Sequence, residues 1–127
     1  MSRVVLDASA LMALLRREQG AEIVAAVIPD AAIAMINIAE VLGKLVDYGT
    51  PEAEAFAAIS GLGIEMVDDD LALARASARL REHTRKYGLS LGDRICLALG
   101  ERLNVPLLTA DRAWAGLALP LTVQVIR

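Results

Sequence analysis

The sequence has 127 residues, a length that suits one domain with a genuine hydrophobic core. Hydrophobic residues make up 56% of it, above the usual share of about 45–50%, so intrinsic disorder is excluded and a partner that covers apolar surface is expected. The net charge of −3 is not typical of a nucleic-acid-binding protein. Every apolar run is shorter than a membrane span, and a single cysteine fits a reducing compartment, so we expect a cytoplasmic protein without a membrane association.

Apolar runs of strand length alternate with helical patterns along the chain. We expect strands at 3–6, 31–36, 63–67, 105–110 and 121–126. We expect helices at 9–18, 21–28, 37–49, 51–60, 68–88 and 91–103. Ser9 is predicted to cap the first helix, and Thr50-Pro51 to begin the fourth as cap and first-turn proline. Because the strands are apolar and alternate with helices, residues 1–127 are predicted to form one α/β domain: a three-layer α/β/α sandwich around a mostly parallel sheet of four to five strands.

Four acids stand where predicted strands end or one turn into the following helix. Asp7 follows the first strand and Asp111 the strand at 105–110, whereas Glu40 and Asp93 lie near helix starts. Ligands of an open parallel sheet bind at the carboxyl edge of its strands, so we expect these carboxylates to converge there. Carboxylates that close repel one another and need a cation or a proton. Oxygen ligands without clustered His or Cys favour Mg²⁺ or Mn²⁺ over zinc.

Each of these acids also has an ordinary structural interpretation. Asp7 is able to cap the first helix, and Asp111 to form a turn with Arg112. Two further acids occupy the third position of capping boxes, namely Asn37-x-x-Glu40 and Ser90-x-x-Asp93. Capping does not explain why an acid follows both the first and the fourth strand, so the capping and metal-binding interpretations both stay open.

The segments that carry the four acids resemble the acidic motifs of PIN-domain ribonucleases, and more narrowly those of VapC-type toxins of bacterial toxin–antitoxin pairs. The segments are VVLDASALMALL, NIAEVLGKL, GLSLGDRICLALG and PLLTADRAW. The resemblance extends from Val4 to the closing VQVIR, and GLSLGDR and LLTADRAW are its most specific part. It implies a three-layer α/β/α fold, divalent-metal-dependent RNA cleavage, and inhibition by a small cognate antitoxin.

Matched residue by residue, the resemblance implies that the catalytic and metal-ligating residues are Asp7, Glu40, Asp93 and Asp111. Asp7 and Asp93 are then the principal ligands of Mg²⁺ or Mn²⁺. Thr109 and Ser9 are expected to orient the acids without binding the metal. The function so implied is a metal-dependent endoribonuclease toxin, in which a metal-activated water cleaves an RNA phosphodiester. The partners so implied are an RNA substrate, the antitoxin and a second copy in a homodimer.

Because the protein is acidic, binding of RNA would depend on locally placed basic side chains. Arg94 and Arg112 each follow one of the acids and are predicted to contact the substrate or a neighbouring carboxylate. Four further side chains recur three or four residues apart on the helix at 68–88 and share one face, namely Arg75, Arg79, His83 and Lys86. Of these, Arg79 is our candidate for substrate binding, although an ordinary solvated face has the same pattern.

The remaining features are given structural roles. Cys96 and Trp114 are expected to be buried, and His83 exposed. The acids Asp68-Asp69-Asp70 are expected to begin a helix rather than bind metal. Apolar segments are expected to form grooves for a partner, and they are LMALL, AEIVAAVI and AEAFAAI.

Two other classes of function stay open. One is a phosphoryl-transfer domain with Asp7 as the nucleophile, although Ser9 stands where a haloacid-dehalogenase-like site has a second acid. A response-regulator receiver domain would also need paired acids after the first strand and a late lysine, which the sequence lacks. The other class is a non-catalytic binding module that keeps the acids as helix caps, and it predicts no metal affinity.

Overall fold

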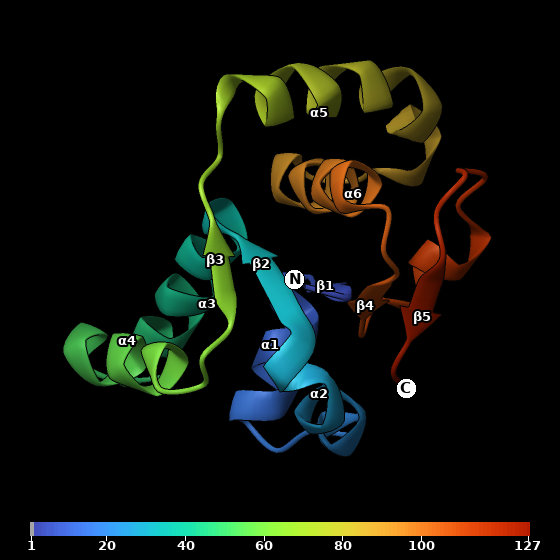
Figure 1. The fold of residues 1–127 in the computed structure, drawn as a ribbon. Helices are drawn as coiled ribbons and strands as arrows, with labels where there is room; N and C mark the ends of the chain where they lie inside the picture. Colours follow the sequence, from blue (N-terminus) through green and yellow to red (C-terminus); the bar gives the residue numbers. More distant parts are fainter. Residues whose placement is uncertain (1) are drawn as a thin grey trace.

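A computed structural model describes residues 2–127, in which a five-stranded sheet lies between two layers of helices (Figure 1). The strands are β1 (Val4–Leu6), β2 (Ala31–Ala34), β3 (Glu65–Val67), β4 (Leu107–Thr109) and β5 (Val123–Val125). Their order is β3-β2-β1-β4-β5, and every neighbouring pair is parallel. The predicted α/β/α class and parallel sheet are therefore confirmed.

Within residues 2–127, six α-helices and three short 3₁₀ helices surround the sheet. The α-helices are α1 (Ala8–Leu15), α2 (Ala21–Val27), α3 (Met35–Asp47), α4 (Glu52–Ser60), α5 (Leu71–Thr84) and α6 (Leu91–Leu103). The 3₁₀ helices are η1 (Ile28–Asp30), η2 (Arg85–Tyr87) and η3 (Arg112–Gly116). In Figure 1, α5 and α6 lie on one side of the sheet, and α1 to α4 on the other. No helix within residues 2–127 is both long and apolar enough to cross a lipid bilayer.

The central strand explains why the core divides into two clusters. Val4 and Leu6 face the cluster formed with α1 to α4, and Val5 faces the cluster formed with α5 and α6. Successive strand residues point to opposite faces of a sheet, so a strand covered on both faces has to be apolar throughout. Cys96 and Trp114 are buried in the second cluster, as predicted.

Several helices begin at residues other than those predicted. Ser9 does not cap the first helix, because Asp7 occupies the N-cap position and its side chain accepts from the backbone N–H of Ala10. The helix predicted to start at Asn37 begins at Met35. The strand predicted at 31–36 therefore ends two residues early, because an apolar run does not by itself distinguish a strand from a buried helix.

The boundaries of α4 and α5 differ from prediction for similar local reasons. Thr50 is not the cap of α4, because Pro51 itself stands at the N-cap position and has no side-chain donor or acceptor to offer. The helix predicted at 68–88 begins three residues later, where the Asp70 side chain accepts from the backbone N–H of Leu73. It then ends as η2 before Gly88, which has a φ of 67°. The predicted capping role of this acidic run is confirmed at Asp70.

The strand order of the sheet reverses at one point, between β1 and β4. The chain passes from β1 outward through β2 to β3, and then returns to place β4 on the other side of β1. In open α/β sheets, ligands bind at the carboxyl ends of the strands beside such a reversal. That position lies between the residues that follow β1 and β4.

Candidate functional site

Asp7 is the most buried of the four candidate acids, with only 4% of the residue exposed. It directly follows β1, and its carboxylate accepts hydrogen bonds from the Ala10 N–H at 2.8 Å, the Ser9 hydroxyl at 2.7 Å and the Thr109 hydroxyl at 2.5 Å. Burial raises the pKa of Asp7 above its ordinary value, the three hydrogen bonds oppose that rise, and the negative charge of Asp93 adds to it. Asp7 is thus a desolvated carboxylate held by neutral donors alone.

Two hydroxyl groups connect Asp7 to the end of β4. The Ser9 hydroxyl accepts from the Ala110 N–H at 2.8 Å while donating to Asp7. The Thr109 hydroxyl likewise accepts from the Asp111 N–H at 3.0 Å. Each hydroxyl therefore donates to Asp7 and accepts from a backbone N–H in the loop after β4. The structure places both predicted orienting residues, Thr109 and Ser9, directly on this acid.

Glu40 reaches the start of α6 from α3. Its Oε1 accepts from the Asn37 side-chain amide at 3.3 Å, and the same amide donates to the Gly92 carbonyl at 3.2 Å. A β-carbon at Gly92 would overlap the Glu40 carboxylate, so glycine is what lets the two segments approach. Burial raises the pKa of Glu40, the charge of Asp93 raises it further, and Asn37 and Lys44 lower it. Glu40 therefore lies against Gly92, the residue before Asp93.

Asp93 forms the capping box that its spacing predicts. Its Oδ2 accepts from the Ser90 backbone N–H at 3.0 Å, and its own N–H donates to the Ser90 hydroxyl at 3.1 Å. The charge of the same carboxylate raises the pKa of both Asp7 and Glu40, so it acts on both acids. Capping of α6 and proximity to the other acids are therefore compatible. The second proposed box is absent, because Asn37 lies inside α3 and uses its side chain on Glu40 and Gly92.

Asp111 differs from the other three acids because it is exposed. It stands at the N-cap of η3, where its Oδ1 accepts from the Ala113 N–H at 2.9 Å. It is connected to Asp7 through Thr109, which accepts from its backbone N–H. The carboxyl edge of the sheet thus brings Asp7, Glu40 and Asp93 together, with Asp111 at the margin.

The sequence pattern of the PIN domain family matches residues 4–119 of this chain. The chain belongs to the PIN domain family. No curated protein sequence matches it significantly. Solved structures match over nearly the whole chain, among them a toxin–antitoxin complex from Klebsiella pneumoniae (22% identity, TM-score 0.73, 98% of both chains). Others are DNA-bound VapBC from Salmonella typhimurium (13%, 0.76, 100% of both chains) and VapBC-5 from Mycobacterium tuberculosis (24%, 0.62, 100% of this chain and 99% of that one). At these identities the likeness shows the fold.

The acids of this PIN domain fit a hard divalent cation in their chemistry. All are oxygen donors, and no lysine or arginine of residues 2–127 forms an ion pair with any of them. Cys96 lies beneath them as a neutral thiol, because burial and then the charges of the nearby acids raise its pKa well above the ordinary value. As the side chains of the described residues stand, no three of them form a ready-made metal cluster. Three acids keep one oxygen without a hydrogen-bond partner among these residues, and they are Glu40, Asp93 and Asp111.

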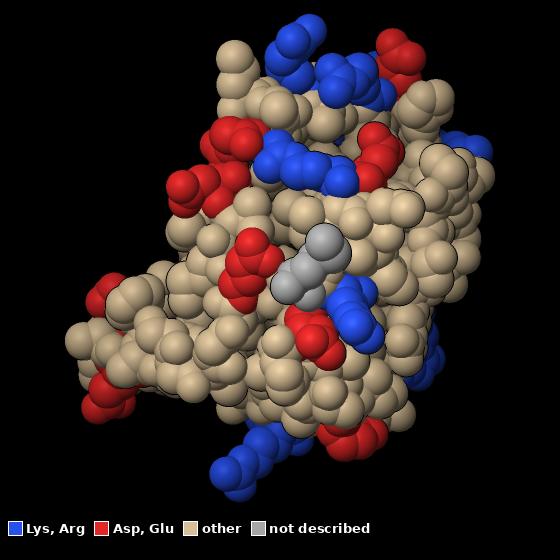
Figure 2. Space-filling view, in the orientation of Figure 1, with Lys and Arg blue, Asp and Glu red and all other residues tan. Residues whose placement is uncertain are grey.

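The arginines predicted to touch substrate have other contacts in the PIN domain. Arg94 donates from Nη1 to the Ser77 carbonyl on α5 at 3.2 Å, and Arg112 donates from Nε to the Arg127 carbonyl at 3.1 Å. Arg79 lines a hollow between α5 and the second half of α6. On the face shown in Figure 2, Lys and Arg gather over α5, at the top. No hydrogen bond or ion pair between described residues joins these three arginines to the acids.

Two residues that orient the acids were missed by the sequence reasoning. The sequence pattern predicts Asn37 as a helix cap, but its side-chain amide donates both to Glu40 and to the Gly92 carbonyl at the start of α6. Gly92 was given no role, although the Glu40 carboxylate lies against it. Glycine at the second position of a helix is a weak signal, because helix starts tolerate it for many reasons. Lys44 was also missed, although it stands four residues after Glu40 and so shares its helix face.

Proposed function

We propose that this PIN domain is a divalent-metal-dependent endoribonuclease that acts as the toxin of a toxin–antitoxin pair. The observation that carries the proposal is the environment of Asp7. This carboxylate is almost fully buried, two further acids add negative charge to the same edge of the sheet, and no lysine or arginine of residues 2–127 forms an ion pair with Asp7. A bound cation is what would stabilise such a group.

The ion would be Mg²⁺ or Mn²⁺, held principally by Asp7 and Asp93, with Glu40 and Asp111 completing the acidic site. When bound, it would supply positive charge to a phosphodiester and lower the pKa of the attacking water. The chain's own groups hold the acids in place. Ser9 and Thr109 fix the carboxylate of Asp7, while the other acids are fixed by Asn37 and Ser90. Such support from neighbouring groups orients ligands and tunes a metal.

An apolar edge at α3 and α4 supports the proposal of a protein partner. Val46 and Phe56 are exposed there by 46% and 47%, and several of the solved structures that match are described as toxin–antitoxin or VapBC complexes. We expect the antitoxin to cover this edge, and a second copy to form a homodimer. In the LMALL segment, Leu11 and Met12 are buried in the core, and only Leu14 and Leu15 remain partly exposed.

A cleavage assay on single-stranded RNA tests the proposed activity. The wild-type chain should cleave in Mg²⁺ or Mn²⁺ and stop in EDTA, and Asp7→Asn should abolish cleavage. Asp30→Asn is the matched control, because Asp30 is exposed and precedes β2 at the opposite edge of the sheet. Cleavage that survives Asp7→Asn, or needs no metal, would contradict the proposal.

Expression in bacteria tests the biological role. The wild-type chain should arrest growth, and Asp7→Asn should relieve the arrest, because RNA cleavage and growth arrest would require the same acid. If a reading frame directly upstream encodes a small DNA-binding protein, co-expression of that protein should restore growth. Growth that is equally slow with both variants would contradict a toxin nuclease.

A further inference from the structure

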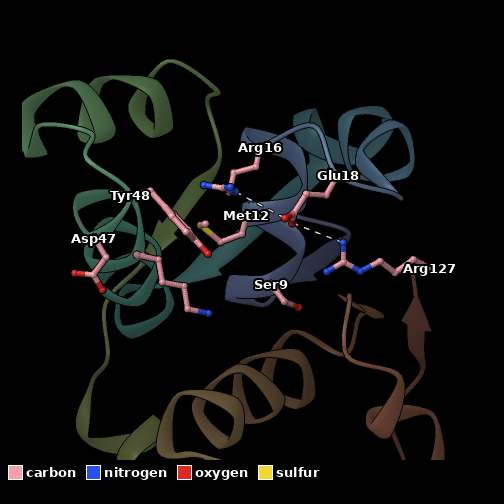
Figure 3. Close-up of a pocket in the computed structure, with 8 residues that line it drawn as sticks. Ser9, Met12, Arg16, Glu18, Asp47, Tyr48 and Arg127 are labelled. Carbon is pink, nitrogen blue, oxygen red and sulfur yellow. Dashed lines mark ion pairs between the residues drawn. The ribbon is translucent and has the colours of Figure 1, made fainter.

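A pocket of about 320 Å³ lies between α1, α3 and the last residue of the chain (Figure 3). This volume falls within the range of about 300–1,000 Å³ that is typical of small-molecule sites. All of its lining residues except Met12 carry a polar, charged or aromatic group, and they are Ser9, Arg16, Glu18, Lys44, Asp47, Tyr48 and Arg127. The function described above does not use this pocket.

The pocket adjoins the acidic site at two points. Ser9 lines the pocket, and its hydroxyl donates to Asp7 at 2.7 Å. Lys44 also lines it, and its positive charge lowers the pKa of Glu40. A ligand in the pocket would therefore lie against Ser9, which contacts Asp7, on the side of α1 and α3.

The pocket is more positive than the protein around it. Arg16, Lys44 and Arg127 are balanced there by the carboxylates of Glu18 and Asp47 and by the terminal carboxylate of Arg127, whereas the whole chain carries a net charge of −3. Figure 3 shows Glu18 lying between the two arginines, at nitrogen–oxygen distances of 3.8 and 3.6 Å. Exposed pairs of this kind contribute little free energy. Lys44 forms no ion pair with any of residues 2–127. The pocket can therefore accept an anion.

The pocket also presents a flat aromatic group. Tyr48 is 62% exposed at the end of α3, and the Arg16 guanidinium carbon lies 3.7 Å from the centre of its ring. Stacking on the guanidinium fixes the ring in one orientation. Aromatic rings and guanidinium planes are the groups on which unpaired nucleic-acid bases stack. An anion site beside such a plane matches one nucleotide.

We propose that this pocket binds one nucleotide of single-stranded RNA, next to the phosphodiester that is cut at the acidic site. Lys44 and Arg127 bind the phosphate, and the Arg16–Tyr48 stack receives the base. The proposal rests on the proposed ribonuclease function and names the residues that position its substrate. The aromatic plane favours a nucleotide over an acidic protein segment, because a carboxylate would use the cations but not the ring.

Binding of a fluorescent six-nucleotide RNA in EDTA, where no cleavage occurs, tests the base-stacking step. Tyr48→Ala should weaken binding by at least about fivefold, since stacking of one base contributes roughly that much or more. Tyr48→Phe should bind as the wild type does. Phe56→Ala is the matched control, because it removes an exposed aromatic ring outside the pocket, on α4. Equal binding by Tyr48→Ala and the wild type would overturn the proposal.

The salt dependence of the same binding tests the phosphate step. Lys44→Gln should reduce the slope of log affinity against log salt by about 0.7, the effect of one phosphate contact on single-stranded nucleic acid. Lys86→Gln on η2 makes the same change of charge far from the pocket and should leave the slope unchanged. If Lys86→Gln reduces the slope and Lys44→Gln does not, RNA binds over α5 and the proposal is wrong. A hexaglutamate peptide that displaces the RNA with equal affinity would also overturn it, since the pocket would then recognise charge alone.

Cleavage kinetics separate this inference from the proposed function. If the wild-type chain cleaves RNA in Mn²⁺ and Tyr48→Ala and Lys44→Gln raise KM with little change in kcat, both are supported. If the wild type cleaves and neither variant changes KM, the pocket proposal fails while the ribonuclease stands. If the wild type binds the RNA through Tyr48 and Lys44 but does not cleave it in any divalent metal, the proposed function fails and the binding site stands.

Discussion

The side-chain hydroxyl of Thr109 donates a hydrogen bond to the Asp7 carboxylate across 2.5 Å, although the two residues are 102 positions apart in the sequence. The same hydroxyl accepts from the backbone N–H of Asp111. This one oxygen atom therefore connects the ends of β1 and β4, at the point where the strand order of the sheet reverses. Two of the four candidate acids depend on it for their placement.

Replacing Thr109 should separate the role of its hydroxyl from that of its volume. Thr109→Val keeps the shape but removes the donor to Asp7, so we expect metal-dependent cleavage to fall by about 10- to 100-fold, as is usual when the groups that orient ligands are lost. Thr109→Ser keeps the hydroxyl and should retain most of the activity. The measurement is kcat/KM for RNA cleavage in Mn²⁺. Equal activity of Thr109→Val and the wild type would show that Asp7 does not need this bond.

Asp7 should make the metal-free protein less stable as the pH rises. Its pKa is raised in the folded protein by burial, so between the ordinary value of 3.8 and the folded value the folded state keeps a proton that the unfolded state has released. The free energy of unfolding therefore falls through this window and stays lower above it. Asp7→Asn does not titrate, so in EDTA at pH 8 it should be more stable than the wild type by about 1 kcal/mol. Urea unfolding at pH 4 and pH 8 measures the difference, which should vanish at the lower pH.

Adding a divalent metal should reverse that order of stability. An ion that binds only the folded state stabilises it by mass action, by about 2.7 kcal/mol at a concentration 100 times its Kd. Mn²⁺ should therefore raise the Tm of the wild type and leave that of Asp7→Asn nearly unchanged. An equal rise in both proteins would place the ion elsewhere. No rise in either protein would favour the non-catalytic binding module over the nuclease.

The sequence was sufficient for the fold because its signals are local and repeated. Apolar runs of strand length alternate with amphipathic runs, and that alternation leads to a parallel sheet covered on both faces. Helix starts were harder to predict. Met35 and Ile36 continue the apolar run of β2, yet they belong to α3, because the change from strand to helix there leaves no mark in the composition.

The site was only partly predictable for a different reason. The four acids could be proposed as a site because each stands next to a predicted strand or helix start, and those positions share one edge of the sheet. The pocket around Tyr48 could not be found, because Arg127 and Arg16 come together only in the folded chain. The contacts of the arginines within the protein could not be predicted on the same ground: the spacing shows which face Arg94 occupies but not that its side chain donates to the Ser77 carbonyl.

Two substitutions at the start of α6 should separate capping from chemistry. Ser90→Ala removes the acceptor for the Asp93 N–H, so it should lower the free energy of unfolding by about 0.5–2 kcal/mol while the purified protein still cleaves RNA. Asp93→Asn keeps an oxygen that can accept from the Ser90 N–H, so it should be less destabilising but should abolish metal-dependent cleavage. The two variants are compared by urea unfolding and by cleavage in Mn²⁺. If Asp93→Asn cleaves as the wild type does, Asp93 is only a cap.

Gly92 should be required for the position of Glu40 rather than for the helix that contains it. A β-carbon at Gly92 would overlap the Glu40 carboxylate, so Gly92→Ala should displace that acid and lower cleavage by about 10- to 100-fold, as small misplacements of catalytic groups do. Gly43→Ala is the matched control, because a β-carbon at Gly43 meets no atom within 4 Å and the residue lies inside α3. It should raise the free energy of unfolding by about 1 kcal/mol through helix propensity and leave cleavage unchanged. Cleavage rates and urea unfolding of both variants provide the comparison. Full activity in Gly92→Ala would show that cleavage does not depend on where Glu40 lies.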